Sequence, residues 1–326
     1  MTSHLRWPIA LATLAGLGAA IWAIGSVGFS ALAHAALRMG AGGFLLFCVG
    51  SLALSAILGA AWLASMPGQP LRQWPLFTWA RMAREGANDL LPFSQVGGLV
   101  VGARTLTGAG LPGARVYAAM VVDLTTEMAG QVVFTLFGLA VLGSVLVDGT
   151  QHNVAPLAWV GAGVTIAMTG AFILLQKPML KLAGALAEHL LPNAHISLDR
   201  LHAELSDIYR RRGAVAMSFL LNLLGWLAAS LLGALALMLI GDPIPVWRVI
   251  ALESLIFAIR AAAFVIPGAI GVQEAGYVLL GPLLGLDPQA AVALSLIKRA
   301  RDIVIGLPSL IAWQANEMRP RRAGRA

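Results

Sequence analysis

Residues 41 to 65, AGGFLLFCVGSLALSAILGAAWLAS, contain no charged side chain and are long enough to cross a lipid bilayer as one helix. About 20 apolar residues in an α-helix span the hydrocarbon core of a membrane. The stretch is also rich in Gly and Ala, which lets neighbouring helices approach closely inside a membrane. It therefore predicts a transmembrane helix over about 41–65.

Further uncharged stretches decide the fold class. They are Trp7 to Leu37, Met128 to Val147, Gly149 to Gln176 and Gly213 to Gly241. Of the 326 residues, 59% are hydrophobic and 11% are charged, whereas soluble proteins have about 25% charged residues and could not bury so much apolar surface. Strands of a β-barrel would show about ten residues of alternating polarity, and these runs do not alternate. We predict an all-α polytopic membrane protein.

The distribution of basic residues predicts the topology. The chain has 22 basic and 15 acidic residues, and the excess lies in the segment 177–212 and in the tail 316–326. The positive-inside rule places such segments in the cytoplasm, so we attribute the excess to topology and expect no nucleic-acid partner. We predict spans at about 8–27, 41–65, 114–147, 155–175, 213–240 and 288–314. Both termini are then cytoplasmic.

Three smaller points complete the outline. The apolar run at 8–27 is longer than a signal-peptide core, so we expect an uncleaved helix. The segment 177–212 mixes charged and apolar residues, which predicts amphipathic helices whose charges are solvated or contact anionic lipid. The single cysteine, Cys48, excludes a disulfide within one chain and is expected in the core. No cofactor or metal is expected.

Two segments interrupt the apolar pattern. Pro92 and the pair Gly97-Gly98 break the first, and Pro267, Gly268 and Gly271 break the second. The pieces on either side of each break are too short to span a bilayer, so we predict two re-entrant hairpins. The second could instead be two complete crossings. The glycines either let backbone approach a ligand or let helices pack, and packing is the simpler interpretation.

The two broken segments indicate an inverted-topology repeat. Aligning the halves places Pro92 on Pro267, although the identities do not exceed what this composition gives by chance. The order of elements is the better argument, because each half has a span, a broken hairpin and a long helix. Repeat one covers about 41–147 and repeat two about 213–314, within a single transmembrane domain over 1–315. Secondary transporters built this way bind substrate where the interrupted segments meet.

Ionisable residues inside spans cost roughly 2.5–3.5 kcal/mol each at the membrane centre, so they mark partners or a polar path. Asp123 and Glu127 lie four residues apart and share a helix face, whereas Arg301 is expected to point away from Asp302. Either the acids of the third span pair with the bases of the last helix, or a cavity between the repeats receives an anionic head group. The candidate site residues are Arg84, Glu85, Asn88, Arg104, Asp123, Glu127, Arg260, Gln273, Glu274, Lys298, Arg299, Arg301 and Asp302.

In the second interpretation each charge has a role. Arg299, Arg301 and Arg104 would receive the head group, because guanidinium groups bind phosphate well. Asp123, Glu127 and Glu274 would serve as counter-charges or proton carriers.

These motifs resemble a known family. The matching residues are Arg84-Glu85-Gly-Ala-Asn88-Asp-Leu-Leu-Pro92, Gly97-Gly98, Asp123, Glu127, Pro267-Gly-Ala-Ile-Gly271-Val-Gln273-Glu274, Arg299 and Arg301-Asp302. Over about 40–315 the chain resembles the flippase-like transmembrane region of lysylphosphatidylglycerol synthases, and more closely the hopanoid-biosynthesis-associated membrane proteins of the HpnL type. The resemblance implies movement of lipids between leaflets and, for the HpnL type, a link to hopanoids in the inner membrane of a bacterium. Many relatives carry Arg after the Asp of the third span, where this chain has Leu124.

The leading hypothesis is therefore a lipid transporter or flippase for an anionic phospholipid or a hopanoid-type lipid. The synthases carry a soluble aminoacyl-transferase domain after this region, and we expect none here, so we do not expect an enzyme. An intramembrane lipid-modifying transferase is one alternative, with Asp123, Glu127 and Glu274 as acid–base groups. A non-catalytic scaffold that binds lipid-biosynthesis proteins through 177–212 is another.

Overall fold

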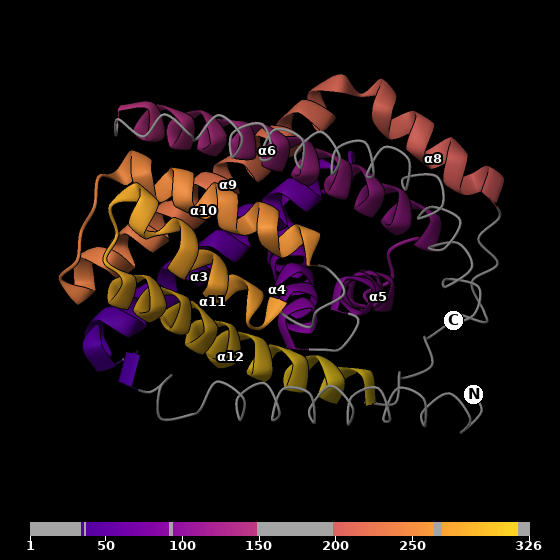
Figure 1. Cartoon of the computed structure of the whole chain (residues 1–326). Coiled ribbons are helices and arrows are strands. Elements are labelled where there is room, and N and C mark those ends of the chain that lie inside the picture. Colours follow the sequence, from indigo (N-terminus) through magenta and orange to yellow (C-terminus); the bar gives the residue numbers. More distant parts are fainter. Residues whose placement is uncertain (1–33, 36, 91–93, 149–197, 264–268, 319–326) are drawn as a thin grey trace.

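The computed structural model describes residues 34–35, 37–90, 94–148, 198–263 and 269–318 (Figure 1). Every regular element within these ranges is helical, which confirms the all-α class. The helices are α3 Ala41–Ala64, α4 Trp74–Leu90, α5 Ser94–Gly108, α6 Gly113–Asp148, α8 Leu198–Arg210, α9 Arg212–Ile240, α10 Val246–Ala262, α11 Val272–Leu280 and α12 Pro288–Met318, with the short 3₁₀ turns η2 Leu71–Gln73 and η4 Pro282–Leu284.

Three of the predicted spans are confirmed as helices that are long and apolar enough to cross a membrane. They are α3, residues Gly113–Val145 of α6, and α9. The last predicted span, 288–314, lies within α12, whose interior charges make it more polar than the other three. The predicted spans at 8–27 and 155–175 lie outside the described residues, so the total of six remains a prediction.

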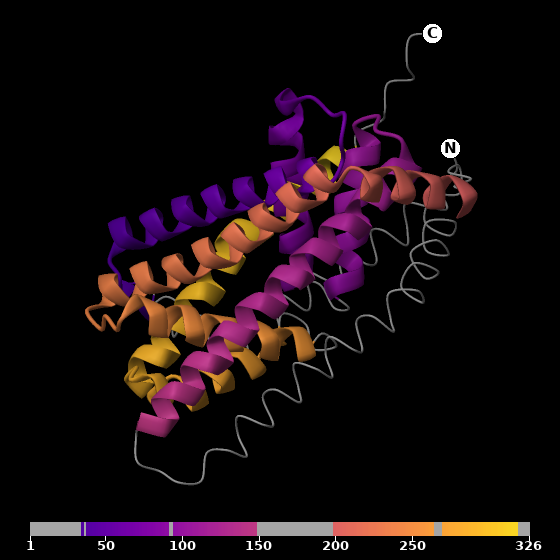
Figure 2. The same ribbon diagram turned by 90° about the horizontal axis from the view of Figure 1, so that it is seen from above.

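The long helices pack side by side, and the shorter ones cover them. Helix α9 contacts both α3 and α6, and Figure 2 shows these three long helices running past one another. Helix α4 packs on α3 and α12, while α10 packs on α6 and α9. Helix α11 lies between α10 and α12. Helix α12 therefore contacts one piece of each broken segment, α4 of the first and α11 of the second.

The broken segments consist of short helices, as expected. Helices α4 and α5 have 17 and 15 residues, about 26 and 23 Å at the α-helical rise, which is less than the ~30 Å hydrocarbon core. Helices α10 and α11 have 17 and 9 residues. Pro92, Pro267 and Gly268 lie outside the described residues. Whether these pieces re-enter the membrane, and in which direction, remains a prediction.

Two of the predicted break glycines have different local roles. A Cβ atom on Gly98 would lie 1.9 Å from Oδ1 of Asn88, so α5 can pack on α4 only where no side chain intervenes. This contact agrees with the packing interpretation. Gly271 is the N-cap residue of α11 and has a φ of 80°, a backbone conformation that residues other than glycine rarely adopt. A Cβ atom at this position would meet no atom within 4 Å.

The described part of the amphipathic segment is α8, and its apolar face is not free for the membrane. Leu201, Leu205 and Ile208 are buried in a cluster with Val116 and Met120 of α6. In this part the apolar side of the helix packs against protein, and the cytoplasmic position of the segment stays a prediction. Residues 177–197 lie outside the described ranges.

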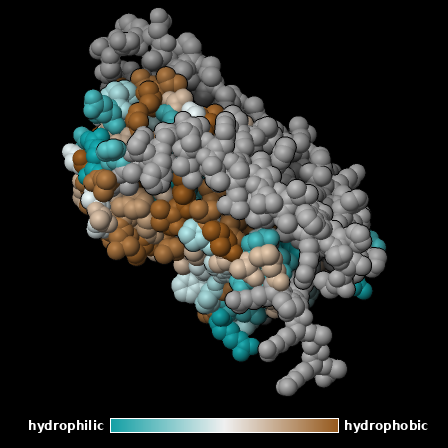
Figure 3. All heavy atoms as spheres, turned by 90° about the horizontal axis from the view of Figure 1, so that it is seen from below, coloured by the Kyte–Doolittle hydropathy of each residue, from teal (hydrophilic) through white to brown (hydrophobic). Residues whose placement is uncertain are grey.

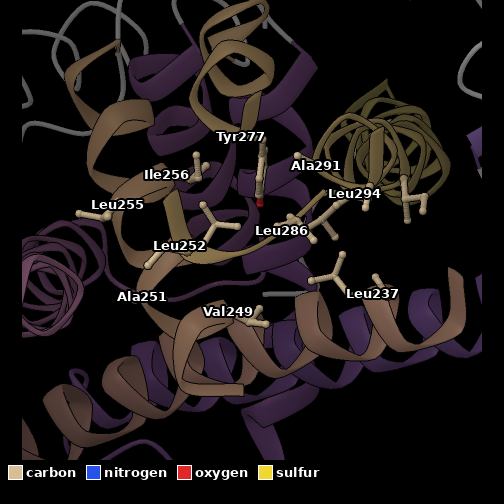
Figure 4. Close-up of a cluster of buried hydrophobic side chains, with 14 of the residues drawn as sticks. Leu237, Val249, Ala251, Leu252, Leu255, Ile256, Tyr277, Leu286, Ala291 and Leu294 are labelled. Atoms are coloured by element: carbon tan, nitrogen blue, oxygen red, sulfur yellow. The ribbon is translucent and has the colours of Figure 1, made fainter. Parts of the chain in front are cut away.

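Apolar side chains divide between two cores and an outer surface. One core surrounds Tyr277, whose ring points into a cluster from α9, α10 and α12 (Figure 4). The other surrounds Trp62 and Phe77. Large apolar side chains such as Leu45 and Leu220 are exposed on α3 and α9, as expected for helices in contact with lipid. Figure 3 shows hydrophobic residues gathered together in one area of the surface, with hydrophilic residues on either side of it.

Candidate functional site

Four charged side chains form a buried network between α4 and α6, which we call the inner network. Oδ2 of Asp123 accepts hydrogen bonds from Nη1 of Arg81 at 3.3 Å and from Nη1 of Arg84 at 3.2 Å. The carboxylate of Glu127 accepts from the same two arginines, at 2.5 Å from Arg81 Nη2 and 3.1 Å from Arg84 Nη2. Two positive and two negative charges balance within the network. Such balance is what permits ionised groups to remain in an apolar interior.

Helix α9 completes the inner network with neutral groups. Nδ2 of Asn222 donates to Oδ1 of Asp123 at 3.3 Å and to Oγ1 of Thr126 at 3.1 Å. The hydroxyl of Thr126 also lies 2.9 Å from that of Ser218. Asn222 and Ser218 are fully buried on α9. The network thus joins three helices, and hydrogen bonds satisfy both oxygens of the buried carboxylate.

The partners of the inner network differ from those expected. Asp123 and Glu127 do share one face of α6, but they pair with Arg81 and Arg84 of α4 and with no basic residue of α12. Arg81 and Arg84 are three residues apart, so both guanidinium groups extend from the same side of α4. Arg81 is absent from the predicted candidates, although it is among the largest fully buried side chains of the described residues.

A second buried group lies in the other half of the chain. The hydroxyl of Tyr277 donates to Oε1 of Glu253 at 2.7 Å. Nζ of Lys298 pairs with the same carboxylate and lies 2.9 Å from the tyrosine oxygen. The three residues come from α10, α11 and α12, so they tie the second broken segment to the last helix. Nearby, Nε2 of Gln273 donates to Ser295 at 3.2 Å.

A third set of charges, the junction cluster, lies where the broken segments meet. Its members are Asp89 of α4, Arg260 of α10, Glu274 of α11, and Arg299, Arg301 and Asp302 of α12. Arg260 pairs with Asp89 at 2.9 Å, Arg299 with Glu274 at 3.3 Å, and Arg301 with Asp302. Asp89 is also within electrostatic reach of Arg301 and Asp302. The cluster therefore connects side chains from both halves.

The junction cluster contains more partly open charges than the other two groups. The side chains of Asp89, Arg260 and Glu274 are 16%, 19% and 21% exposed. Arg301 is 17% exposed, whereas Arg299 and Asp302 are buried, at 4% and 2%. In the inner network Glu127 is 16% exposed, and Asp123, Arg81 and Arg84 are at most 4% exposed. A ligand can reach charges only where they are partly open, so the junction cluster is the accessible candidate.

The remaining predicted residues lie at the edges of these groups. Glu85 pairs with Arg81 at 2.9 Å, Arg104 pairs with Glu317 of α12, and Asn88 lies against Gly98. The expectation that Arg301 points away from Asp302 was wrong, since Nε of Arg301 donates to Asp302 at 2.9 Å. The long guanidinium side chain folds back along its own helix, which helical spacing alone does not reveal.

Sequence reasoning did not include Arg81, Asn222, Glu253 or Tyr277 among the candidates. Glu253 and Asn222 stand inside apolar runs, where any polar side chain is a signal. Tyr277 gave no such signal, because an aromatic residue is common in an apolar helix.

The protein is thus a helical membrane protein whose interior charges are paired in groups. The most accessible group lies beside the two broken segments. The comparison with family models then identifies the family. The chain belongs to the family of the lysylphosphatidylglycerol synthase transmembrane region, whose model matches residues 9–309. No curated protein and no solved structure matches the chain. Membership ties the protein to the handling of membrane lipids.

Proposed function

We propose that this protein moves lipids between the leaflets of a bacterial inner membrane and that the lipid head group passes through the junction cluster. The observation that carries the proposal is the composition of that cluster. Three arginines and three carboxylates from α4, α10, α11 and α12 lie together beside both breaks. Four of the six side chains are partly open, and Arg299 and Asp302 are buried behind them. Phospholipid and hopanoid-type lipids are the proposed cargo, and the two halves are proposed to be inverted repeats.

The chemistry of the cluster suits a phosphate-bearing head group. A phosphate oxygen can take the place of a carboxylate on a guanidinium group, with bonds of similar geometry and strength. Glu274 holds Arg299 from the start of α11, and its Oε2 accepts a 2.7 Å hydrogen bond from the backbone N–H of Gly271. In our proposal the arriving phosphate replaces Glu274 on Arg299, and the released carboxylate keeps its bond to the backbone.

The pairing also explains how charges remain in the membrane when no lipid is bound. An unpaired charge at the centre of a span would cost several kcal/mol, on the order of 2.5–3.5 by insertion scales. Exchange of one anion for another on Arg299 keeps the arginine paired, and the extra negative charge rests on the released Glu274 carboxylate, which is 21% exposed and keeps the hydrogen bond from Gly271. We propose that this exchange lets the head group cross without leaving an arginine uncompensated.

Transport in liposomes tests the proposal. The full-length protein is reconstituted in vesicles with a fluorescent phospholipid, and the fraction of label that reaches the outer leaflet is followed by chemical quenching. We expect faster movement with protein than without it. Glu274→Gln and Arg299→Gln should slow it, whereas Glu204→Gln on α8, which is remote from the cluster and only loosely paired with Arg115 at 4.0 Å, should not. Equal rates with and without protein would refute transport.

The two alternatives give different results in simple assays. A lipid-modifying enzyme would produce a new lipid species when the protein is incubated with a bacterial lipid extract. A scaffold would lose its whole effect when 177–212 is deleted and would move no lipid in vesicles. We propose that neither result will be found.

A further inference from the structure

A groove of about 400 Å³ lies on the outside of the protein where α6, α8 and α9 meet. Its residues are Thr125, Thr126 and Ala129 of α6, Tyr209 of α8, and Arg212, Val215, Ala216 and Phe219 of α9. The volume falls within the roughly 300–1,000 Å³ of typical small-molecule sites. None of these residues belongs to the junction cluster, so the groove is a separate feature.

The groove is apolar along its length and basic at one end. Ala129, Val215, Ala216 and Phe219 supply only hydrocarbon and aromatic surface. Arg212 stands at the first residue of α9, is exposed, and forms no ion pair with any described residue. Its neighbour Arg211 is already paired, with Asp207 at 3.4 Å. The available positive charge thus lies beside the apolar surface.

The position in the fold indicates what fills such a groove. Helices α6 and α9 are both long and apolar enough to cross a membrane, and the groove follows their contact. Arg212 begins the apolar helix, where basic side chains meet lipid head groups at the edge of the hydrocarbon core. A ligand here meets hydrocarbon walls and, at one end, a cation.

We infer that the groove binds one anionic phospholipid, with an acyl chain along Val215 and Phe219 and the phosphate on Arg212. Tyr209 is placed to contact the glycerol region, since its hydroxyl lies 3.5 Å from that of Thr125 at the same end of the groove. The complementarity of an acidic head group to Arg212 is what favours an anionic lipid over a zwitterionic one.

The bound lipid would contact the inner network through one residue. Thr126 lines the groove and accepts the 3.1 Å hydrogen bond from Asn222, which in turn bonds Asp123. The groove is thus two hydrogen bonds from the buried carboxylate. We therefore assign the groove to a lipid that stays bound and supports the packing of α6 on α9. This lipid is distinct from the lipid that the protein transports.

Native mass spectrometry of the full-length protein tests this inference. Phosphatidylglycerol and phosphatidylcholine are added in turn, at equal concentration, to detergent-solubilised protein, and the fraction carrying one lipid is measured. We expect phosphatidylglycerol to bind more tightly, and Arg212→Gln to weaken it by roughly five-fold, the change that one lost arginine contact at a membrane surface gives. Arg210→Gln is the matched control, because it removes an exposed charge two residues away that does not line the groove.

Filling the groove provides an independent variant. Ala129→Phe and Ala216→Phe replace exposed alanines on its walls, so both are expected to fold and to exclude either lipid. Glycerol phosphate, which has the head group without acyl chains, should not compete. If Arg212→Gln and Arg210→Gln weaken binding equally, or if the filling variants bind lipid as the parent does, the inference is overturned. Binding is measured without transport, so a failure here is distinct from a failure of the proposed function.

Discussion

Arg260 donates a 2.9 Å hydrogen bond to Oδ1 of Asp89, and this contact joins α10 to α4 across 171 residues of sequence. Both side chains are less than one fifth exposed, so solvent screens the pair only partly. The pair fixes one broken segment to the other. If the two halves move relative to each other at this point, this ion pair must therefore either break or move with them.

Replacing one member of this pair should destabilise the protein. We expect Arg260→Gln and Asp89→Asn each to lower stability by about 1–3 kcal/mol, because each leaves a partly buried charge without its partner. The exchange Asp89→Arg with Arg260→Asp should recover part of the loss. Thermal unfolding in detergent measures all three. A swapped protein no more stable than the worse single variant would show that the ion pair contributes little.

Two glycines hold the backbones of α4 and α12 together. A Cβ on Gly86 would lie 2.9 Å from the carbonyl oxygen of Gly306, and one on Gly306 would lie 3.2 Å from Cα of Gly86. Gly86→Ala should therefore push the helices apart and lower the thermal midpoint, since backbone atoms cannot move aside as a flexible side chain can.

The matched control for this prediction is Gly143→Ala on α6, where a new Cβ meets no atom within 4 Å. In a helix interior alanine is favoured over glycine by up to about 1 kcal/mol. The control should be neutral or slightly stabilising while Gly86→Ala is destabilising. If both substitutions stabilise the protein, the close approach of the two helices is not required.

The sequence was sufficient to predict the long helices closely. The spans expected at 114–147 and 213–240 correspond to Gly113–Asp148 and Arg212–Ile240. Apolar runs of this length admit only one regular structure in a membrane, and the flanking loops mark where each run ends. The short helices of the broken segments were expected too, from their prolines and glycines.

The site was only half predictable, for a physical reason. A charge in an apolar run is rare, so Asp123, Glu127 and Lys298 were conspicuous. Helical periodicity shows which residues share a face, but it does not show which other helix that face meets. Consequently the predicted candidates do not include Arg81, which lies near other arginines in a polar stretch. They also do not include Glu253, the partner of Lys298. The close approach of Gly86 and Gly306 likewise depends on tertiary packing alone.

The buried Lys298–Glu253 pair gives a third prediction. Lys298→Met should be strongly destabilising, by about 3–5 kcal/mol, because it leaves the wholly buried Glu253 carboxylate with only the hydroxyl of Tyr277. The double variant Lys298→Met with Glu253→Gln removes both charges and should regain most of the stability. Thermal unfolding of the single and double variants checks this, and additive losses would contradict it.

Asp123 gives the last prediction, because it is the most enclosed acid of the inner network. Its carboxylate accepts hydrogen bonds from Arg81, Arg84 and Asn222. Asp123→Asn keeps the shape but removes the wholly buried carboxylate and leaves Arg84 only Glu127, which it shares with Arg81, so we expect a loss of about 3–5 kcal/mol. Adding Arg84→Gln restores the balance of charge.

We therefore expect the double variant Asp123→Asn with Arg84→Gln to be more stable than the sum of the two single losses predicts. Asp199→Asn, an exposed acid on α8, is the control and should leave the thermal midpoint within the error of the parent. Equal effects of Asp123→Asn and Asp199→Asn would mean that the carboxylate is not buried among arginines. A strictly additive double variant would mean instead that Asp123 and Arg84 act independently, and that their 3.2 Å contact contributes no coupling energy.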